Sequence, residues 1–156
     1  MIYDRSFDQR QLYDFFSENA DQFSSNLLEQ IERSGNGTLE QYTEKLSRMA
    51  TIACEMEAGR IKGVVIGYTH NLPEDRGSYI TYVVVAPAFR RQGVMRRLLE
   101  EYEAYCRTMD VSYIWLATGK INKVAQQAYE RCGFVCAGPH NERTLKYVKE
   151  LKKDPD

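Results

Sequence analysis

A cluster of four arginines carries the strongest chemical signal in the sequence. Arg90, Arg91, Arg96 and Arg97 fall in a segment, 88–97, that contains no acidic side chain. The segment follows an apolar run and opens the most regular helical pattern of the chain. Because a helix N-terminus has a partial positive charge and about four unpaired N–H groups, cations are disfavoured there. A bound anion would remove this conflict, so the cluster predicts a phosphate or pyrophosphate site.

Local ion pairing is the alternative interpretation of part of this cluster. Arg96 and Arg97 each have a glutamate four residues later, at Glu100 and Glu101, and such pairs would leave a solvated basic surface. The two preceding arginines have no acid at this spacing. Pairing therefore accounts for only half of the cluster.

The spacing of hydrophobic residues predicts the helices and strands that must position the arginine cluster. Apolar residues favour a helix over 7–23, and Thr38 can cap a second helix that ends near Met49. The Ala58-Gly59-Arg60 turn lies between two strand-like segments and predicts a hairpin. The other predicted elements are strands at 51–56, 64–69, 78–86, 113–117, 134–137 and 144–148, and helices at 94–109 and 123–131.

This order of elements predicts an α+β fold in a single domain spanning residues 1–156. We expect a mixed, mostly antiparallel sheet of about six to seven strands flanked by about four helices. The strand, helix, strand run from 78 to 117 fits a crossover unit, which would make its two strands parallel.

Composition and charge narrow the classes of function. The 156 residues include 21 Lys and Arg and 22 Asp and Glu, a formal net charge of −1, which gives no support to nucleic-acid or anionic-membrane binding. No segment is apolar enough to span a membrane, and the N-terminus lacks the pattern of a secretory signal. A cytoplasmic location is expected. The four cysteines form no CxxC pair, so no metal site is expected.

The arginine segment resembles the signature of the GNAT superfamily of acetyl-CoA-dependent N-acetyltransferases. In that signature Gln or Arg is followed by two residues, Gly, one residue, and Gly or Ala; Arg90 and Gly93 match, and Met95 occupies the last position. Asn122 and the run from Ala128 to Phe134 resemble the second motif of the family, which ends in Tyr, two or three residues, Gly and Phe. The resemblance covers about residues 49–148.

The resemblance implies roles for individual residues. In the family the strand that corresponds to 78–86 is splayed from the next one, its backbone at Val83 and Val85 pairs with the pantetheine arm, and an N–H near its end, here that of Val85, polarises the acetyl carbonyl. Backbone N–H groups of 92–96 would hold the pyrophosphate. The implied cofactor-binding residues are Val83, Val85, Arg90, Arg91, Gln92, Gly93, Val94, Met95, Arg96, Asn122 and Tyr129.

Tyr129 is the predicted general acid. Tyr129 and the Val85 N–H are the two predicted catalytic groups. A phenol, whose ordinary pKa is near 10, stays protonated at neutral pH and can donate a proton to the departing CoA thiolate. Taken alone, Tyr129 also fits a core aromatic on an apolar helix face, and the motif context favours the acid. Asn122 suits two roles, as a helix cap and as a CoA contact.

The general base is left open by the sequence. The strand 78–86 contains no carboxylate, and the candidates are Glu55, Glu57, Tyr82 and His70, the last acting through water. A water chain to solvent would suffice for an acceptor amine of modest pKa.

The expected function is transfer of an acetyl group from acetyl-CoA to a primary amine of a small molecule, by direct attack in a ternary complex without a metal. Residues 1–50 are expected on the acceptor side, and 51–150 are expected to form the sheet and the acetyl-CoA site. Two alternatives are a non-catalytic acyl-CoA-binding or regulatory domain and an acetyltransferase for protein amines. A third is an anion-responsive module for nucleic acid or phosphoprotein. Exposed edge strands near the C-terminus allow a homodimer.

Overall fold

The computed structural model describes residues 9–23 and 26–151. Four α-helices come first, and the chain then alternates between strands and helices. The helices are α1 (Gln9–Glu18), α2 (Ala20–Phe23), α3 (Leu27–Arg33), α4 (Leu39–Met49), α5 (Val94–Thr108) and α6 (Lys123–Arg131), with a 3-10 helix η1 (Pro87–Phe89) before α5. The strands are β1 (Thr51–Glu57), β2 (Arg60–Thr69), β3 (Gly77–Val85), β4 (Tyr113–Gly119), β5 (Val135–Pro139) and β6 (Thr144–Glu150).

The strands form one sheet in the order β1-β2-β3-β4-β6-β5. Strand β3 pairs with β4 in parallel, whereas β6 pairs antiparallel with both β4 and β5. The predicted α+β class and the predicted parallel crossover between β3 and β4 are therefore confirmed. The strands fall within about two residues of their predicted positions, apart from β2, which begins four residues earlier than the predicted strand.

Two compact units divide the chain. The N-terminal unit comprises residues up to Ile66 and Tyr82–Tyr102, and the C-terminal unit comprises Gly67–Thr81 and the residues from Glu103 onward. Strands β2 and β3 and helix α5 each contribute residues to both units. The candidate site residues are divided between the two units in the same way.

The N-terminal unit is built on helices α1 to α4 and the β1–β2 hairpin. Thr38 begins α4 with a capping box: its hydroxyl accepts from the Gln41 N–H (3.2 Å), and the Gln41 side chain accepts from the Thr38 N–H (2.9 Å). The hairpin turns through Ala58 and Gly59, whose φ values of 50° and 79° fit the type I′ turn favoured by the twist of paired strands. Both sequence predictions, the Thr38 cap and the hairpin turn, are confirmed.

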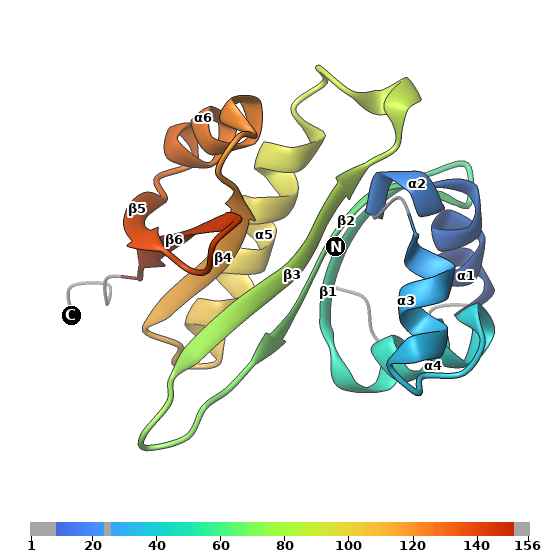
Figure 1. The fold of residues 1–156 in the computed structure, drawn as a ribbon, viewed down its shortest axis with the longest axis horizontal. Coiled ribbons are helices and arrows are strands. Elements are labelled where there is room, and N and C mark those ends of the chain that lie inside the picture. Colours follow the sequence, from blue (N-terminus) through green and yellow to red (C-terminus); the bar gives the residue numbers. More distant parts are fainter. Residues whose placement is uncertain (1–8, 24–25, 152–156) are drawn as a thin grey trace. The chain divides into compact units, whose positions relative to one another are not determined.

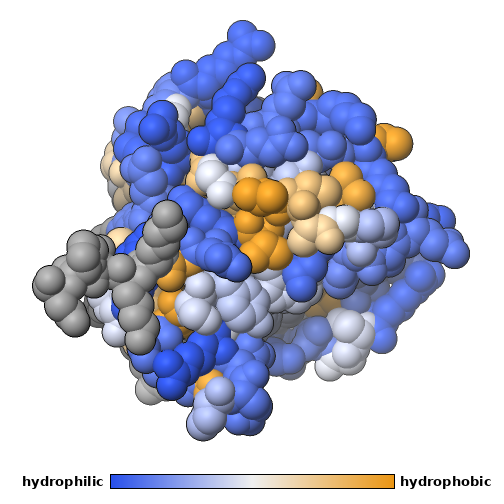
Figure 2. All heavy atoms as spheres, turned by 90° about the vertical axis from the view of Figure 1, so that its left-hand side faces the viewer, coloured by the Kyte–Doolittle hydropathy of each residue, from blue (hydrophilic) through white to orange (hydrophobic). Residues whose placement is uncertain are grey.

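The C-terminal unit contains β4, β6 and β5 side by side, with α6 inserted in the chain between β4 and β5 (Figure 1). Even-numbered residues of β4 are buried, and odd-numbered residues are half-exposed, as expected of a strand with one face in a core. Strand β5 lies at the end of the sheet, and its first three residues are exposed. The face that carries α6 and β5 is mostly hydrophilic with an apolar patch near its centre (Figure 2), and the exposed apolar side chains of these elements include Val124 and Val135.

The N-terminal helices differ from the prediction. The described residues contain six α-helices instead of about four, because the helix predicted over 7–23 is divided into α1 and α2 and because α3 was not predicted. Phe7 lies outside the described residues. Helix α3 buries Leu27 and Ile31, which are four residues apart. Two apolar positions are too few to establish a helical period, so the tertiary contacts of this helix determine its formation.

Candidate active site

The turn between β3 and α5 has a backbone conformation suited to an anion. Arg91 has φ 63° and Gly93 has φ 75°, so the two residues on either side of Gln92 are left-handed. Glycine adopts this conformation freely, but for arginine it costs about 1 kcal/mol or more. Left-handed residues in a turn can direct nearby N–H groups toward one side, which gives a concavity suited to an anion.

The N–H groups of this turn are free of protein partners. Within the part of the chain that the structure describes, no backbone N–H of residues 92–96 donates to another residue, and the first bond of α5 runs from the Arg97 N–H to the Gly93 carbonyl (3.1 Å). The predicted pyrophosphate-binding residues Gln92, Gly93, Val94, Met95 and Arg96 are therefore brought together at one helix start. Met95, at the position where the family pattern has Gly or Ala, presents the same unpaired N–H as its neighbours.

The arginine cluster separates into a paired and an unpaired half. Arg96 lies 3.2 Å from Glu100, as local pairing predicts, but Arg97 binds Glu55 of β1 instead of Glu101. The Arg97–Glu101 pair of the alternative interpretation does not form, because Arg97 instead pairs with Glu55, a carboxylate on a neighbouring strand.

Arg90 and Arg91 form no ion pair with any acidic residue that the structure describes. The Arg90 side chain donates to the Val85 carbonyl (3.3 Å) and to the Gln22 side chain, both neutral acceptors. Arg91 is exposed and has no hydrogen bond or ion pair with a described residue. Two positive charges thus remain beside the unpaired N–H groups of the turn.

Near the end of β3, the backbone polar groups of Val83 and Val85 lie on the strand edge that faces away from β2. The Ala86 N–H donates to the Lys62 carbonyl of β2 (2.9 Å), and adjacent residues of an extended strand direct their polar groups to opposite edges. The polar groups of Val85 and Val83 therefore lie on the other edge, where the Val85 carbonyl meets Arg90. Register with β4 on that edge is limited to three pairs, the last being Tyr79 with Trp115. The backbone at Val83 and Val85 is thus beyond the paired part of the strand.

The C-terminal unit holds the other two predicted residues, Asn122 and Tyr129, at the two ends of α6. Asn122 caps the helix by accepting from the Ala125 N–H (3.1 Å), which confirms the predicted cap. Tyr129 is half-buried, and its ring meets Phe134 edge-on at 6.0 Å. Burial raises the pKa of the Tyr129 phenol to about 12, with a smaller contribution from Cys132. The Tyr129 hydroxyl has no hydrogen-bond partner among the described residues, so its proton is available for donation.

Helix α6 is oriented by a residue that the sequence analysis missed. Gln126 is buried and donates to the carbonyls of Gly119 (2.9 Å) and Lys120 (3.0 Å), where β4 ends. Val124, an apolar residue of the same helix, is 80% exposed. A glutamine gives no hydrophobic signal, so only the tertiary structure identifies it as an inward-facing position.

The candidates for the general base differ in how they are held. Glu55 is half-buried, and its pKa is lowered first by the hydrogen bond from Arg97 and further by the charges of Arg97 and Lys62, which makes it a weak base. Tyr82 shares a hydrogen bond of 2.9 Å with Tyr42. Glu57 and His70 are exposed. The structure thus argues against Glu55 and leaves the base to one of the other three or to water.

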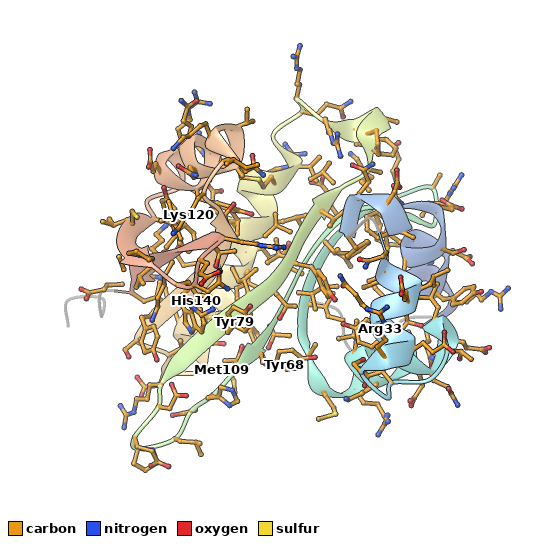
Figure 3. The ribbon with its side chains drawn as sticks, in the orientation of Figure 1. Arg33, Tyr68, Tyr79, Met109, Lys120 and His140 are labelled. Atoms are coloured by element: carbon orange, nitrogen blue, oxygen red, sulfur yellow. The ribbon has the colours of Figure 1, made fainter. Side chains whose placement is uncertain are left out.

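An aromatic group on the half-exposed side of β4 was also missed by the sequence analysis. The Trp115 ring stacks on the Tyr79 ring with 4.2 Å between ring centroids, and its centroid lies 5.4 Å from that of the His140 ring. Tyr79 and His140 are labelled in Figure 3. The Lys146 ammonium lies over the Trp115 ring at 4.6 Å. These side chains come from three strands and one loop, so no local motif contains them.

The described residues include neither a cluster suited to a metal ion nor a helix suited to crossing a membrane. No group of three or more His, Cys, Asp or Glu side chains is arranged to hold a metal ion among them. Among their helices, none has both the length and the apolar composition that crossing a membrane requires.

The chain belongs to the acetyltransferase (GNAT) family, whose model matches residues 12–134. The fold resembles a putative GNAT acetyltransferase from Desulfovibrio desulfuricans, with 15% identity over 96% of this chain and 98% of that one and a TM-score of 0.74. It also resembles a putative streptothricin acetyltransferase from Bacillus anthracis in complex with acetyl coenzyme A, with 21% identity over 67% of this chain and 64% of that one and a TM-score of 0.58.

A third similar structure is nourseothricin acetyltransferase, with 21% identity and a TM-score of 0.56. The match covers 65% of each chain, so this chain corresponds to less than two thirds of that protein. No curated protein matches the sequence. The chain is thus an acetyltransferase-family protein with the corresponding fold, and its acceptor is a separate question.

Proposed function

We propose that the protein transfers an acetyl group from acetyl-CoA to a primary amine of a small molecule by direct attack in a ternary complex. The observation that carries the proposal is the run of unpaired N–H groups at 92–96 with two uncompensated arginines beside it. A diphosphate satisfies both features at once, because the N–H groups, the helix dipole and the guanidinium groups all favour negative charge.

The proposed chemistry uses few protein groups. The amine nitrogen attacks the thioester carbonyl carbon, and the N–H of Val85 stabilises the negative charge that develops on the carbonyl oxygen. The C–S bond then breaks, the amine loses a proton to water or to a base of this chain, and Tyr129 donates its phenolic proton to the thiolate. The raised pKa of Tyr129 keeps it protonated at neutral pH, which supports this assignment.

The acceptor is proposed to be a small molecule on electrostatic grounds. Residues 1–50 are assigned to the acceptor side, and several of their acids are already paired with arginines of the same unit: Glu18 with Arg60, Glu29 with Arg33, and Glu44 with Arg48. These acids offer little free negative charge to a basic protein tail. A protein amine is the second candidate acceptor, and a cytoplasmic location is part of the proposal.

Calorimetric titration of the native chain with acetyl-CoA tests the cofactor half of the proposal. Saturable binding is expected, and the absence of binding would eliminate the proposed site. A thiol-release assay against small amines, amino sugars and peptides then tests transfer. Binding without release across this panel would favour the alternative of a non-catalytic acyl-CoA-binding or regulatory domain.

The kinetic form of the reaction is tested with two substrates varied together. Direct attack in a ternary complex predicts intersecting initial-velocity lines, whereas parallel lines would indicate a covalent acetyl-enzyme. Pairing of two copies through the exposed edge of β5 stays a prediction, and analytical ultracentrifugation distinguishes a monomer from a dimer.

A further inference from the structure

Arg97 connects the proposed diphosphate turn to strand β1. Its Nε and Nη2 atoms donate to the two carboxylate oxygens of Glu55, at 2.8 Å and 3.0 Å. Its Nη1 atom donates to the carbonyl oxygen of Gln92 at 2.7 Å. All three residues belong to the N-terminal unit. One guanidinium therefore bridges a strand and the carbonyl of a loop residue whose neighbours carry the unpaired N–H groups.

The charges around Arg97 hold it in one place. Glu55 is ionised, with Lys62 as a second cation 3.7 Å away, and the planar guanidinium meets the carboxylate in a two-bond fork. Three of the five N–H donors of Arg97 are occupied by Glu55 and Gln92. This arrangement suits a side chain that supports the loop. It is less suited to a side chain that binds a ligand directly through its own charge.

The contact with Gln92 determines the direction of an adjacent N–H group. The Gln92 carbonyl and the Gly93 N–H belong to one planar peptide unit, in which they point in opposite directions. Fixing the carbonyl toward Arg97 therefore turns the Gly93 N–H away from Arg97 and Glu55. A Cβ atom added to Gly93 would lie 3.1 Å from Arg97 Nη1, so the guanidinium also packs closely against this residue.

We propose that Arg97, anchored by Glu55, is a positioning residue that orients the Gln92–Gly93 peptide so that the Gly93 N–H is directed at the diphosphate of acetyl-CoA. The inference rests on the proposed function, because it takes acetyl-CoA as the ligand of the turn. It assigns a role to two residues, Arg97 and Glu55, that the family pattern does not include.

The test compares two ligands that differ in the diphosphate. Affinities of the native chain and of Arg97→Met are measured for acetyl-CoA by calorimetry and for S-acetylpantetheine, which lacks the diphosphate, by NMR titration. In Arg97→Met the dissociation constant of acetyl-CoA is expected to rise about tenfold, the scale of one charge-assisted hydrogen bond, while that of S-acetylpantetheine stays unchanged. Arg97→Lys, which can still donate to the Gln92 carbonyl, is expected to recover part of the affinity.

A matched control is available in the same unit. Arg48 also forms a two-bond pair with a glutamate, Glu44, and its side chain is 56% exposed against 50% for Arg97. Arg48→Met should leave the acetyl-CoA affinity at the native value. Glu55→Gln provides a second variant, in which Arg97 keeps its charge but loses its anchor, and an intermediate loss is expected.

The possible outcomes separate the inference from the proposed function. If the native chain does not bind acetyl-CoA, the proposed function fails and the inference fails with it. If the native chain binds but Arg97→Met binds equally well, only the inference is overturned. Equal weakening for both ligands would also overturn it, since that result indicates a general structural role for Arg97.

Discussion

The hydroxyl of Tyr129 shows how one side chain can be tuned by its surroundings. Burial raises the pKa of this phenol to about 12 because the phenolate would lose its hydration. A higher pKa keeps the proton in place up to strongly basic pH, at the cost of weaker acidity. This balance suits a group that must be protonated in every cycle and that transfers its proton only to a thiolate held beside it.

Replacing Tyr129 by phenylalanine tests this role. Tyr129→Phe is expected to lower the turnover number by about a hundredfold, the usual contribution of a general acid, with little change in acetyl-CoA affinity. The thiol-release assay and calorimetry provide the two measurements. Tyr105→Phe is the control, since Tyr105 is a half-buried tyrosine of the same unit on α5. Unchanged turnover in Tyr129→Phe would remove this residue from the mechanism.

At the scale of elements, helix α6 is held in place by strand β6. The Lys149 ammonium donates to the carbonyl of Cys132 (2.9 Å) at the C-terminal end of α6 and to Glu103 of α5 (2.7 Å). The Tyr147 hydroxyl donates to Glu130 (3.0 Å). These contacts flank the turn of helix that contains Tyr129, so its position depends on β6 as well as on the helix itself.

Loss of the Lys149 contacts should destabilise the fold. Lys149→Met is expected to reduce the free energy of unfolding by about 1–3 kcal/mol, because two charge-assisted hydrogen bonds disappear and a helix-terminal carbonyl loses its partner. Urea unfolding measures the change. Arg33→Met, which removes an exposed pair with Glu29 on α3, should change the stability by no more than about 0.5 kcal/mol. Equal effects of the two substitutions would contradict the anchoring of α6.

At the scale of the whole molecule, each unit contains a partly buried carboxylate held by two cations. Glu55 is held by Arg97 and Lys62, which lower its pKa. Burial alone would raise the pKa of Glu103, but hydrogen bonds from Lys149 and Arg107 lower it overall. Both carboxylates therefore bind a proton less readily in the folded chain than in the unfolded chain.

This difference predicts how stability depends on pH. The unfolded chain takes up protons first as the pH falls through the ordinary glutamate pKa of about 4.5, so stability is full above that value and is lost below it. Unfolding free energies measured from neutral to about pH 3 should show this fall. Glu103→Gln should be less stable at neutral pH but should lose less on acidification, and an identical slope in the variant would contradict the assignment.

Much of the fold was predictable because its elements are amphipathic and long. The helix predicted at 94–109 is confirmed as α5, which buries Val94, Leu98 and Tyr102, and the run from Tyr79 to Val85 lies in the predicted parallel strand. Helix α3 escaped prediction because two buried residues do not define a period. The helix predicted to end near Met49 does end there, and the Met49 side chain is 60% exposed.

The sequence by itself predicted the turn that we propose binds the diphosphate, because the signals of this turn are local. Four arginines at a helix start, a glycine in the same segment and an asparagine before a helix are all properties of a few consecutive residues, and their chemistry follows from helix electrostatics. The partners of those residues were decided by tertiary structure. Arg97 bonds to Glu55 instead of Glu101, Gln126 is buried under the end of β4, and Trp115 lies against Tyr79. Each of these contacts joins residues from different elements, and only folding brings such residues within bonding distance.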